Sequence, residues 1–178
     1  MRKLDSDELN RLDLENVQLA PKIPFVLVLD NIRSGLNVGS IFRTADGFSV
    51  EKIFLTGFTP APPHREILKT ALGSTESVSW EKMESIFTCL MELKNKDYQI
   101  IAIEQTDKSC NLADFHFNNK QKYALILGNE VDGVSDEAIA MCDAGIEIPQ
   151  SGIKHSLNVA VCAGIVVWEA AKSMLNSD

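Results

Sequence analysis

Short, continuous apolar runs restrict the fold of this chain more than any other feature of its sequence. The longer ones cover residues 25–30 (FVLVLD), 98–103 (YQIIAI) and 123–128 (YALILG), and shorter ones cover residues 52–57 and 145–148. A strand of this kind has no polar face to turn towards solvent, which is typical of a parallel sheet that helices cover on both sides. We therefore expect these runs to be the strands of a mostly parallel sheet.

Segments with helical spacing alternate with these runs. Residues 37–48, 83–93 and 156–174 are predicted to be helices, and Asn37 stands where the cap of the first one belongs. The apolar stripe of that helix consists of Val38, Ile41, Phe42 and Ala45. The last helix is apolar on more than one side, so it must be buried by more than its own sheet. The alternation predicts an α/β fold, with a mostly parallel sheet flanked by helices.

Length and composition predict a single domain over residues 1–178. The 45% of hydrophobic residues suffices for a sizeable core, and residues 1–22 form a short polar lead-in with a possible helix over residues 6–12. No apolar run reaches the ~18 residues of a membrane span, and residues 1–7 lack the apolar segment of a secretory signal. We therefore expect a cytoplasmic protein without a membrane partner. Widely separated cysteines predict reduced thiols and no bound metal: Cys89, Cys110, Cys142 and Cys162.

Polar segments at the ends of three apolar runs are candidates for a ligand site. They cover residues 31–46 (NIRSGLNVGSIFRTAD), 125–134 (LILGNEVDGV) and 148–160 (IPQSGIKHSLNVA). In the third segment a proline ends the strand, a glycine lets the loop bend, and Ser156 or Asn158 can cap the helix that follows. This arrangement suits a small ligand, although an ordinary capped helix after a turn has the same pattern.

In their order and separations these three segments resemble the three motifs of the SpoU (TrmH-type) branch of the SPOUT RNA methyltransferases. The resemblance runs from about residue 24 to residue 169. It implies a fold with a deep C-terminal trefoil knot, whereas periodicity alone would favour a plain Rossmann-like winding, because knots are nearly absent from proteins. It also implies transfer of a methyl group from S-adenosyl-L-methionine to a ribose 2′-hydroxyl of RNA.

The resemblance also assigns residues to the cofactor pocket. They lie at the ends of three strands, where the backbone can approach a ligand closely and a few polar groups converge. Gly128 alone could be an ordinary loop glycine, but Glu130 follows it and the third segment lies at the expected distance. The cofactor-binding residues that we expect are Ile103, Glu104, Leu127, Gly128, Asn129, Ile148, Pro149, Gln150, Ser156 and Leu157.

Arg43 matches the arginine that is proposed to activate the attacking hydroxyl in this family. A guanidinium has a reference pKa of ~12.5 or more, so it is a poor general base. We expect Arg43 to bind the phosphate beside the target ribose and to favour the developing alkoxide by its charge. The other members of the expected catalytic set are Asn37, Glu130, Ser156 and Asn158.

The charge balance disfavours an RNA partner at first sight. The chain carries 17 basic and 25 acidic residues, a formal net charge of −8, whereas phosphate contacts need a basic surface. The local field can differ from the average. The expected RNA-binding residues are Arg33, Arg43, Arg65, Lys69 and Lys154, each of which on its own is more often a solvated surface charge. Residues 69–74 fit either a loop that touches RNA or a short helix.

The resemblance further implies a homodimer in which Arg43 acts beside the partner's cofactor. Transfer RNA is favoured over ribosomal RNA, because no added RNA-binding domain is evident. A non-catalytic RNA-binding dimer of the same fold is the alternative, although such a protein should tend to lose Arg43 or Glu130. A Rossmann-type enzyme for small molecules is disfavoured, because no Gly-x-Gly-x-x-Gly follows the first strand.

Overall fold

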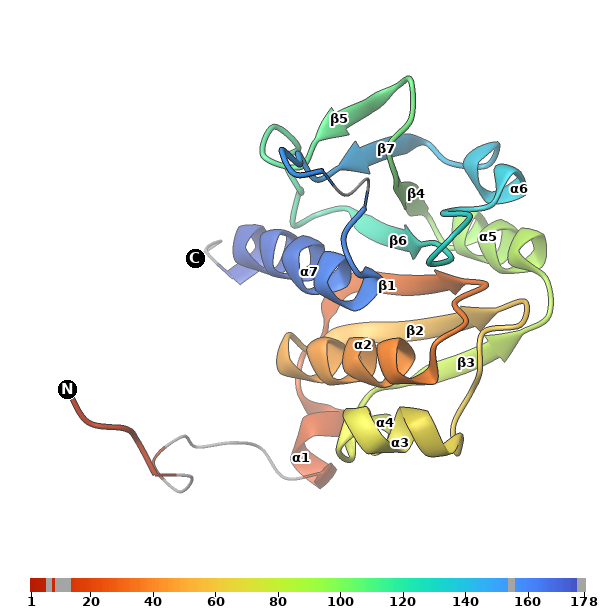
Figure 1. Ribbon diagram of the computed structural model, residues 1–178. Coiled ribbons are helices and arrows are strands. Elements are labelled where there is room, and N and C mark those ends of the chain that lie inside the picture. The colour runs from red at the N-terminus through yellow and green to blue at the C-terminus, as the bar shows by residue number, and fades with distance from the viewer. Residues whose placement is uncertain (6–7, 9–13, 154–155, 176–178) are drawn as a thin grey trace.

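A parallel sheet forms the centre of the computed structural model, which describes residues 1–5, 8, 14–153 and 156–175 (Figure 1). The strand order is β3-β2-β1-β6-β4-β7-β5, and every neighbouring pair is parallel. The strands are β1 (Ile23–Asp30), β2 (Val50–Thr56), β3 (Trp80–Met83), β4 (Tyr98–Ile103), β5 (Ser109–Asn111), β6 (Lys122–Leu127) and β7 (Ala144–Glu147). The predicted α/β class is confirmed.

Helices cover both faces of this sheet. The helices are α1 (Leu14–Leu19), α2 (Gly35–Gly47), α3 (Arg65–Ala71), α4 (Ser74–Ser77), α5 (Ile86–Asn95), α6 (Asp136–Ile139) and α7 (Val159–Leu175). Figure 1 shows α2 and α7 beside each other on one face, with α5 behind the sheet. Among the described residues no helix combines the length and the apolar character needed to cross a membrane.

The side chains of the central strands alternate between two cores, as the pleat of a strand requires. In β1, Phe25, Leu27 and Leu29 belong to the larger core under α2, α3 and α7, whereas Val26 and Val28 belong to the smaller core under α5 and α6. β6 alternates in the same way. Both faces of these strands are therefore buried, which explains why their sequences are continuously apolar.

The edge strands were not predicted. β3 and β5 have four and three residues, and all of these are exposed or only half-buried. Neither strand therefore has the apolar run that identifies β1, β4 and β6. α1 was not predicted either, and the helix expected over residues 6–12 lies almost entirely outside the described residues. The C-terminal trefoil knot stays a prediction.

The cap of α2 is Ser34, so the prediction that Asn37 caps this helix is wrong. The Ser34 hydroxyl oxygen accepts a hydrogen bond from the backbone N–H of Asn37 at 3.3 Å, and the helix begins at Gly35. The serine satisfies one of the free N–H groups of the first turn. The amide side chain of Asn37 is consequently available for contacts with other segments.

α7 begins at Val159, three residues later than predicted. The side-chain oxygen of Asn158 accepts hydrogen bonds from the backbone N–H groups of Ala160 at 2.9 Å and Val161 at 3.4 Å. Of the two caps that the sequence allowed, Asn158 is therefore the one used. Ser156 lies in the loop before the helix.

Close packing of α2 against α3 depends on Gly39. A Cβ atom at this position would collide with the backbone carbonyl oxygen of Ile67 and with the hydroxyl of Thr70. The missing side chain therefore lets α3 lie directly on α2, and the side chains that the two helices expose there become neighbours.

We expect Gly39→Ala to lower the free energy of unfolding by about 1–3 kcal/mol, because a backbone carbonyl cannot move aside cheaply. Gly47→Ala is the matched control, since Gly47 ends the same helix and a Cβ there would meet no atom within 4 Å. Urea unfolding measures both variants. Equal stability of the two would contradict the packing argument.

Candidate functional site

A cavity of about 660 Å³ opens at the carboxyl ends of β4, β6 and β7. Its walls are residues 103–107 after β4, residues 127–134 after β6, and parts of residues 146–157 around the end of β7, with further residues from α6 and α7. Loops at the carboxyl ends of parallel strands are where ligands bind in open α/β sheets. The volume lies within the range of small-ligand sites.

The loop after β6, residues 128–134, folds back on itself. Asn129 and Gly133 exchange two backbone hydrogen bonds of 2.9 and 3.0 Å. The Asn129 side chain accepts a hydrogen bond from the N–H of Val131 at 2.8 Å and donates one to the carbonyl of Asn31 at 2.6 Å. A Cβ at Gly128 would collide with the backbone of Gly133. Gly128 is thus required by the close approach of two backbone segments.

Glu104 supports the same loop from the end of β4. Its carboxylate accepts hydrogen bonds from the N–H of Val134 at 3.0 Å and from the N–H of Gln105 at 2.9 Å. The carboxylate therefore holds two walls of the cavity at a fixed separation. Glu104 therefore has a structural role in the cavity wall that does not require contact with a ligand.

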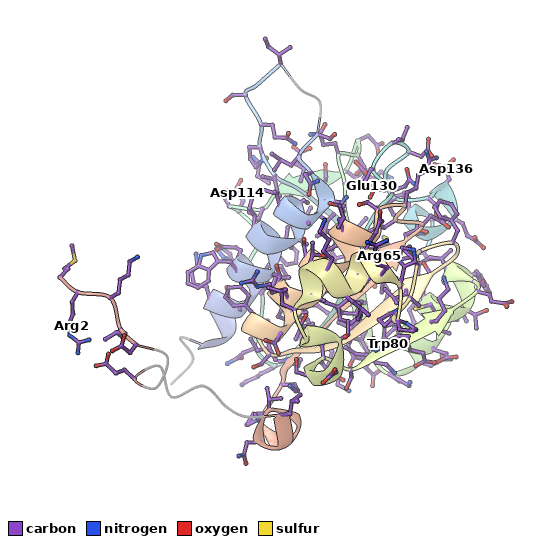
Figure 2. All side chains as sticks on the ribbon, turned by 60° about the horizontal axis from the view of Figure 1, so that its bottom comes forward. Arg2, Arg65, Trp80, Asp114, Glu130 and Asp136 are labelled. Atoms are coloured by element: carbon purple, nitrogen blue, oxygen red, sulfur yellow. The ribbon has the colours of Figure 1, made fainter. Side chains whose placement is uncertain are left out.

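Glu130, which Figure 2 labels, joins the three polar segments. The Glu130 carboxylate accepts hydrogen bonds from the N–H of Arg33 at 2.9 Å, the N–H of Ser34 at 3.1 Å and the side-chain amide of Asn37 at 2.8 Å. The side-chain oxygen of Asn37 in turn accepts a hydrogen bond from the Asn158 amide at 3.1 Å. A continuous chain of hydrogen bonds therefore links the loops after β1, β6 and β7.

These hydrogen bonds also set the protonation of Glu130. Burial acts to raise its pKa, but the hydrogen bonds from Arg33, Asn37 and Ser34 outweigh burial and leave the pKa below its ordinary value. The carboxylate also lies at the N-terminus of α2, where a negative charge is favoured. Glu130 is therefore charged at neutral pH and is a poor proton acceptor.

Arg43 lies outside this cavity. It is exposed on α2 and lines a separate hollow of about 440 Å³ together with Lys69 from α3. The remaining residues of the hollow are Ser40, Thr44, Thr70 and Leu72. The structure therefore brings Asn37, Glu130 and Asn158 together but leaves Arg43 apart from them within one chain.

Most of the expected cofactor residues line the cavity. Those that do are Ile103, Glu104, Leu127, Gly128, Asn129, Ile148, Gln150, Ser156 and Leu157. Pro149 does not, although it lies between the lining residues Ile148 and Gln150.

The expected RNA-binding residues are not gathered around one feature. The Arg33 guanidinium lies 3.5 Å from the Asp132 carboxylate, and both side chains are largely exposed. Arg65, which Figure 2 labels, is exposed on α3 near Lys69 in sequence. Lys154 lies outside the described residues. Of the four that the structure describes, Arg43 and Lys69 line the same hollow.

Sequence reasoning missed several residues of the cavity wall. The loop after β4 could have been predicted as part of the site, because it follows the carboxyl end of a central strand, where ligands bind in sheets of this kind. Cys162 of α7 gave no signal, because it looks like an ordinary core residue. The lining residues that were missed are Gln105, Thr106, Asp107, Asp136, Ile139, Ile146, Glu147 and Cys162; Val131, Asp132, Gly133, Val134 and Val159 lie within the predicted polar segments but were not assigned to the ligand individually.

Two features of the lining restrict its chemistry. Among the described residues, every charged side chain that lines the cavity is a carboxylate: Glu104, Asp107, Glu130, Asp132, Asp136 and Glu147. Burial raises the pKa of the Cys162 thiol to about 11, so this thiol is neutral and a weak nucleophile. The lining therefore favours a ligand that carries positive charge, and it offers no activated cysteine.

We expect Glu130→Gln to lower the free energy of unfolding at pH 7 by about 1–3 kcal/mol, because an amide cannot accept from three donors as a carboxylate does. The pKa of Glu130 is depressed in the folded state, so its stabilisation is complete above the ordinary carboxyl pKa and is lost as pH falls through the folded value.

The difference between the wild type and Glu130→Gln should therefore be full at pH 7 and should shrink below about pH 4.5. Urea unfolding between pH 3 and pH 7 measures it. Glu92→Gln, at an exposed position of α5, is the control and should change stability little at any pH. A Glu130→Gln deficit that stays constant down to pH 3 would rule out the charged carboxylate as the source.

Comparison with known proteins relates the chain to one family. The family model described as "SpoU rRNA Methylase family" matches residues 24–168. A 23S rRNA (guanosine-2′-O-)-methyltransferase RlmB of Neisseria meningitidis is 32% identical over 164 residues, which are 92% of this chain and 64% of that protein. A tRNA (guanosine(18)-2′-O)-methyltransferase of Aquifex aeolicus is 31% identical over 153 residues, which are 83% of this chain and 68% of that protein.

Another relative is an uncharacterized tRNA/rRNA methyltransferase of Borreliella burgdorferi, which is 33% identical over 150 residues, 84% of this chain and 64% of that protein. The chain thus spans 64% of the length of two of these three relatives.

Solved structures share the fold. The A. aeolicus TrmH/SpoU tRNA modifying enzyme superposes with a TM-score of 0.80 at 28% identity, over 90% of this chain and 81% of that one. An AdoMet-bound rRNA methyltransferase from Sinorhizobium meliloti gives a TM-score of 0.79 at 25% identity, over 90% of this chain and 61% of that one.

Proposed function

This chain belongs to the SpoU rRNA methylase family, and we propose that it transfers a methyl group from S-adenosyl-L-methionine to a ribose 2′-hydroxyl of RNA. The observation that carries the proposal is the cavity at the carboxyl ends of β4, β6 and β7. Residues 125–134 and 148–160, which match the second and third motifs of the family, build much of its wall. Residues 31–46, which match the first motif, are hydrogen-bonded to this wall through Glu130. The relatives named as 2′-O-methyltransferases and the AdoMet-bound structure of the S. meliloti protein support the same reading.

The lining of the cavity fits the methyl donor. S-adenosyl-L-methionine brings an activated methyl group on a positively charged sulfonium, so the protein needs to bind and orient it. The apolar strand ends at Ile103, Leu127 and Ile146 offer an apolar wall, and the cavity's carboxylates favour the net positive charge of the donor. Gly128 lets the backbone of the loop wall lie close to the backbone of Gly133.

Glu130, Asn37 and Asn158 act in this proposal as positioning residues. Their hydrogen bonds hold the loops of the cavity against the first turn of α2. Because the pKa of Glu130 is depressed and its oxygens already accept three hydrogen bonds, it is poorly placed to take a proton from the ribose. Its contribution would be the arrangement of the site.

The acceptor side of the reaction would use Arg43. Arg43 and Lys69 line one hollow and offer two positive charges to an RNA phosphate. The charge of Arg43 would then favour the alkoxide that develops at the 2′-oxygen. Since this hollow and the cavity are separate within one chain, the reaction would need the hollow of one subunit beside the cavity of another.

A homodimer through α7 would supply that arrangement. The outer face of α7 exposes Val161, Ile165 and Trp168, and the Trp168 ring lies 5.8 Å from the ring of Phe48, which follows α2. Contact between two such faces would bury this apolar surface. It would also set α2 of one subunit close to the other subunit.

The RNA is proposed to be transfer RNA in preference to ribosomal RNA, and a cytoplasmic location stays a prediction. The deciding experiment is mass spectrometry of tRNA and rRNA from a strain that lacks the gene, followed by transfer of labelled methyl groups to the undermethylated RNA by the purified protein. A missing ribose methyl that the protein restores would support the proposal. RNA binding without any methyl transfer would support a non-catalytic binding protein instead.

We expect Arg43→Ala to lower single-turnover methyl transfer by about 100- to 1,000-fold, because it removes a charge that acts on the developing oxyanion. Stability should change by only about 0.5 kcal/mol, since Arg43 is exposed and lies outside the apolar stripe of α2. Affinity for S-adenosylhomocysteine, measured by calorimetry, should be unchanged because the cavity is separate. Arg43→Lys should rescue poorly, because an ammonium lacks the planar fork. Full activity of Arg43→Ala would remove the proposed role.

We expect Ile165→Glu to convert a dimer into a monomer of 19.6 kDa in light scattering, because a charge in an apolar interface is costly to desolvate. Met91→Glu is the matched control, since Met91 on α5 is 41% exposed and Ile165 is 38% exposed. A wild-type protein that is monomeric at micromolar concentration would exclude the dimer itself.

A further inference from the structure

Leu72, at the end of α3, combines two unfavourable features. Its backbone is left-handed, with φ 51° and ψ 43°, a conformation that is costly for a residue with a Cβ atom. Its side chain is 67% exposed. Gly73 follows directly and also has a positive φ, of 94°. A left-handed residue other than glycine is a reason to look for a function at that position.

The surroundings of Leu72 are cationic. Leu72 lines the hollow that contains Arg43 and Lys69, whereas Leu68, one turn earlier on the same face of α3, does not. Within the described part of the chain, neither Arg43 nor Lys69 has an ion-pair or hydrogen-bond partner. The chain has a formal net charge of −8, so a hollow lined by two unpaired cations differs in sign from the protein as a whole.

The hydroxyl groups of the hollow are largely engaged within the protein. The hydroxyls of Ser40 and Thr70 both donate to the carbonyl oxygen of Leu36 at 2.9 Å. The groups left to meet a ligand are therefore the two cations, the exposed leucine and the hydroxyl of Thr44. A ligand that matches them has an anionic part next to an apolar face.

We propose that Leu72 is an apolar contact for one nucleobase of the RNA, namely that of a nucleotide whose phosphate is bound by Arg43 and Lys69. A nucleotide has an anion and a flat apolar face within one small unit, and unpaired RNA bases are commonly splayed out onto side chains. The left-handed turn at Leu72 ends α3 and leaves this side chain over the hollow. The proposal rests on the proposed function, because it requires RNA as the ligand.

An apolar contact and a phosphate contact have different thermodynamic signatures. Loss of a phosphate contact reduces the dependence of binding on salt, because fewer counterions are released. Loss of an apolar contact lowers affinity at every salt concentration but leaves that dependence unchanged. The two roles assigned to this hollow can therefore be separated in one titration series.

The test compares Leu72→Gly, Leu68→Ala and Lys69→Gln. Leu72→Gly removes the side chain while favouring the left-handed backbone, so its fold should be retained or stabilised, as a thermal melt would check. Leu72→Asn is a second variant, since asparagine also tolerates this conformation. Leu68, 44% exposed on the same helix, is the matched control outside the hollow. The probe is bulk tRNA from a strain that lacks the gene, with Kd measured at several salt concentrations.

Leu72→Gly and Leu72→Asn should bind this RNA about 5- to 20-fold more weakly at every salt concentration, as expected when a base covers only part of one leucine side chain. Their slope of log Kd against log salt should equal that of the wild type. Lys69→Gln should reduce this slope by about 0.7–0.9. Leu68→Ala should match the wild type in both quantities.

Wild-type affinity in Leu72→Gly would overturn the proposal. A changed salt slope in this variant would also overturn it, because Leu72 would then position the cations. A changed molecular mass would overturn it as well, because Leu72 would then contact a second subunit. These outcomes leave the proposed function intact, since the wild type would still bind RNA and transfer methyl groups. Failure of the wild type itself to bind RNA would overturn both.

Discussion

A single carboxylate holds the architecture of this site together. Glu130 comes from the loop after β6, and its oxygens accept hydrogen bonds from two backbone N–H groups and one side-chain amide at the beginning of α2. The start of a helix has free N–H groups that need acceptors, and a charged acceptor there is also favoured by the helix dipole. Without this carboxylate, the charged contact left between the described parts of the loop and the start of the helix would be the exposed pair of Arg33 and Asp132, 3.5 Å apart.

α2 contributes residues to two separate places in the molecule. Its first turn, with Asn37, is hydrogen-bonded to the loops of the cavity, whereas Arg43 lies six residues later, roughly 9 Å further along the axis and on a different side of the helix. Close packing at Gly39 adds α3 and hence Lys69 to the second place. One rigid helix therefore carries both the support of the cavity and half of the cationic hollow.

The central part of the fold could be predicted from the sequence, because strands buried on both faces need continuous apolar runs, and β1, β4 and β6 have them. The edge strands β3 and β5 could not, since half-exposed short strands take their structure from their neighbours. Most of the cavity wall followed from the three polar segments. The separation of Arg43 from Glu130 was implied by the family resemblance, which sets Arg43 beside the partner's cofactor, and not by the motifs themselves, because a motif shows the order of residues but not the direction in which each helical residue points. Ser34 was overlooked as a cap because Asn37 is an equally good capping residue by type.

The loop of residues 128–134 has a further consequence for ligand binding. Its backbone hydrogen bonds between Asn129 and Gly133, the side chain of Asn129 and the support from Glu104 fix its shape in the folded chain. The conformational entropy of this wall is therefore lost when the protein folds and not when a ligand arrives. A ligand that enters the cavity meets a preorganised surface, so more of its interaction energy is available as affinity.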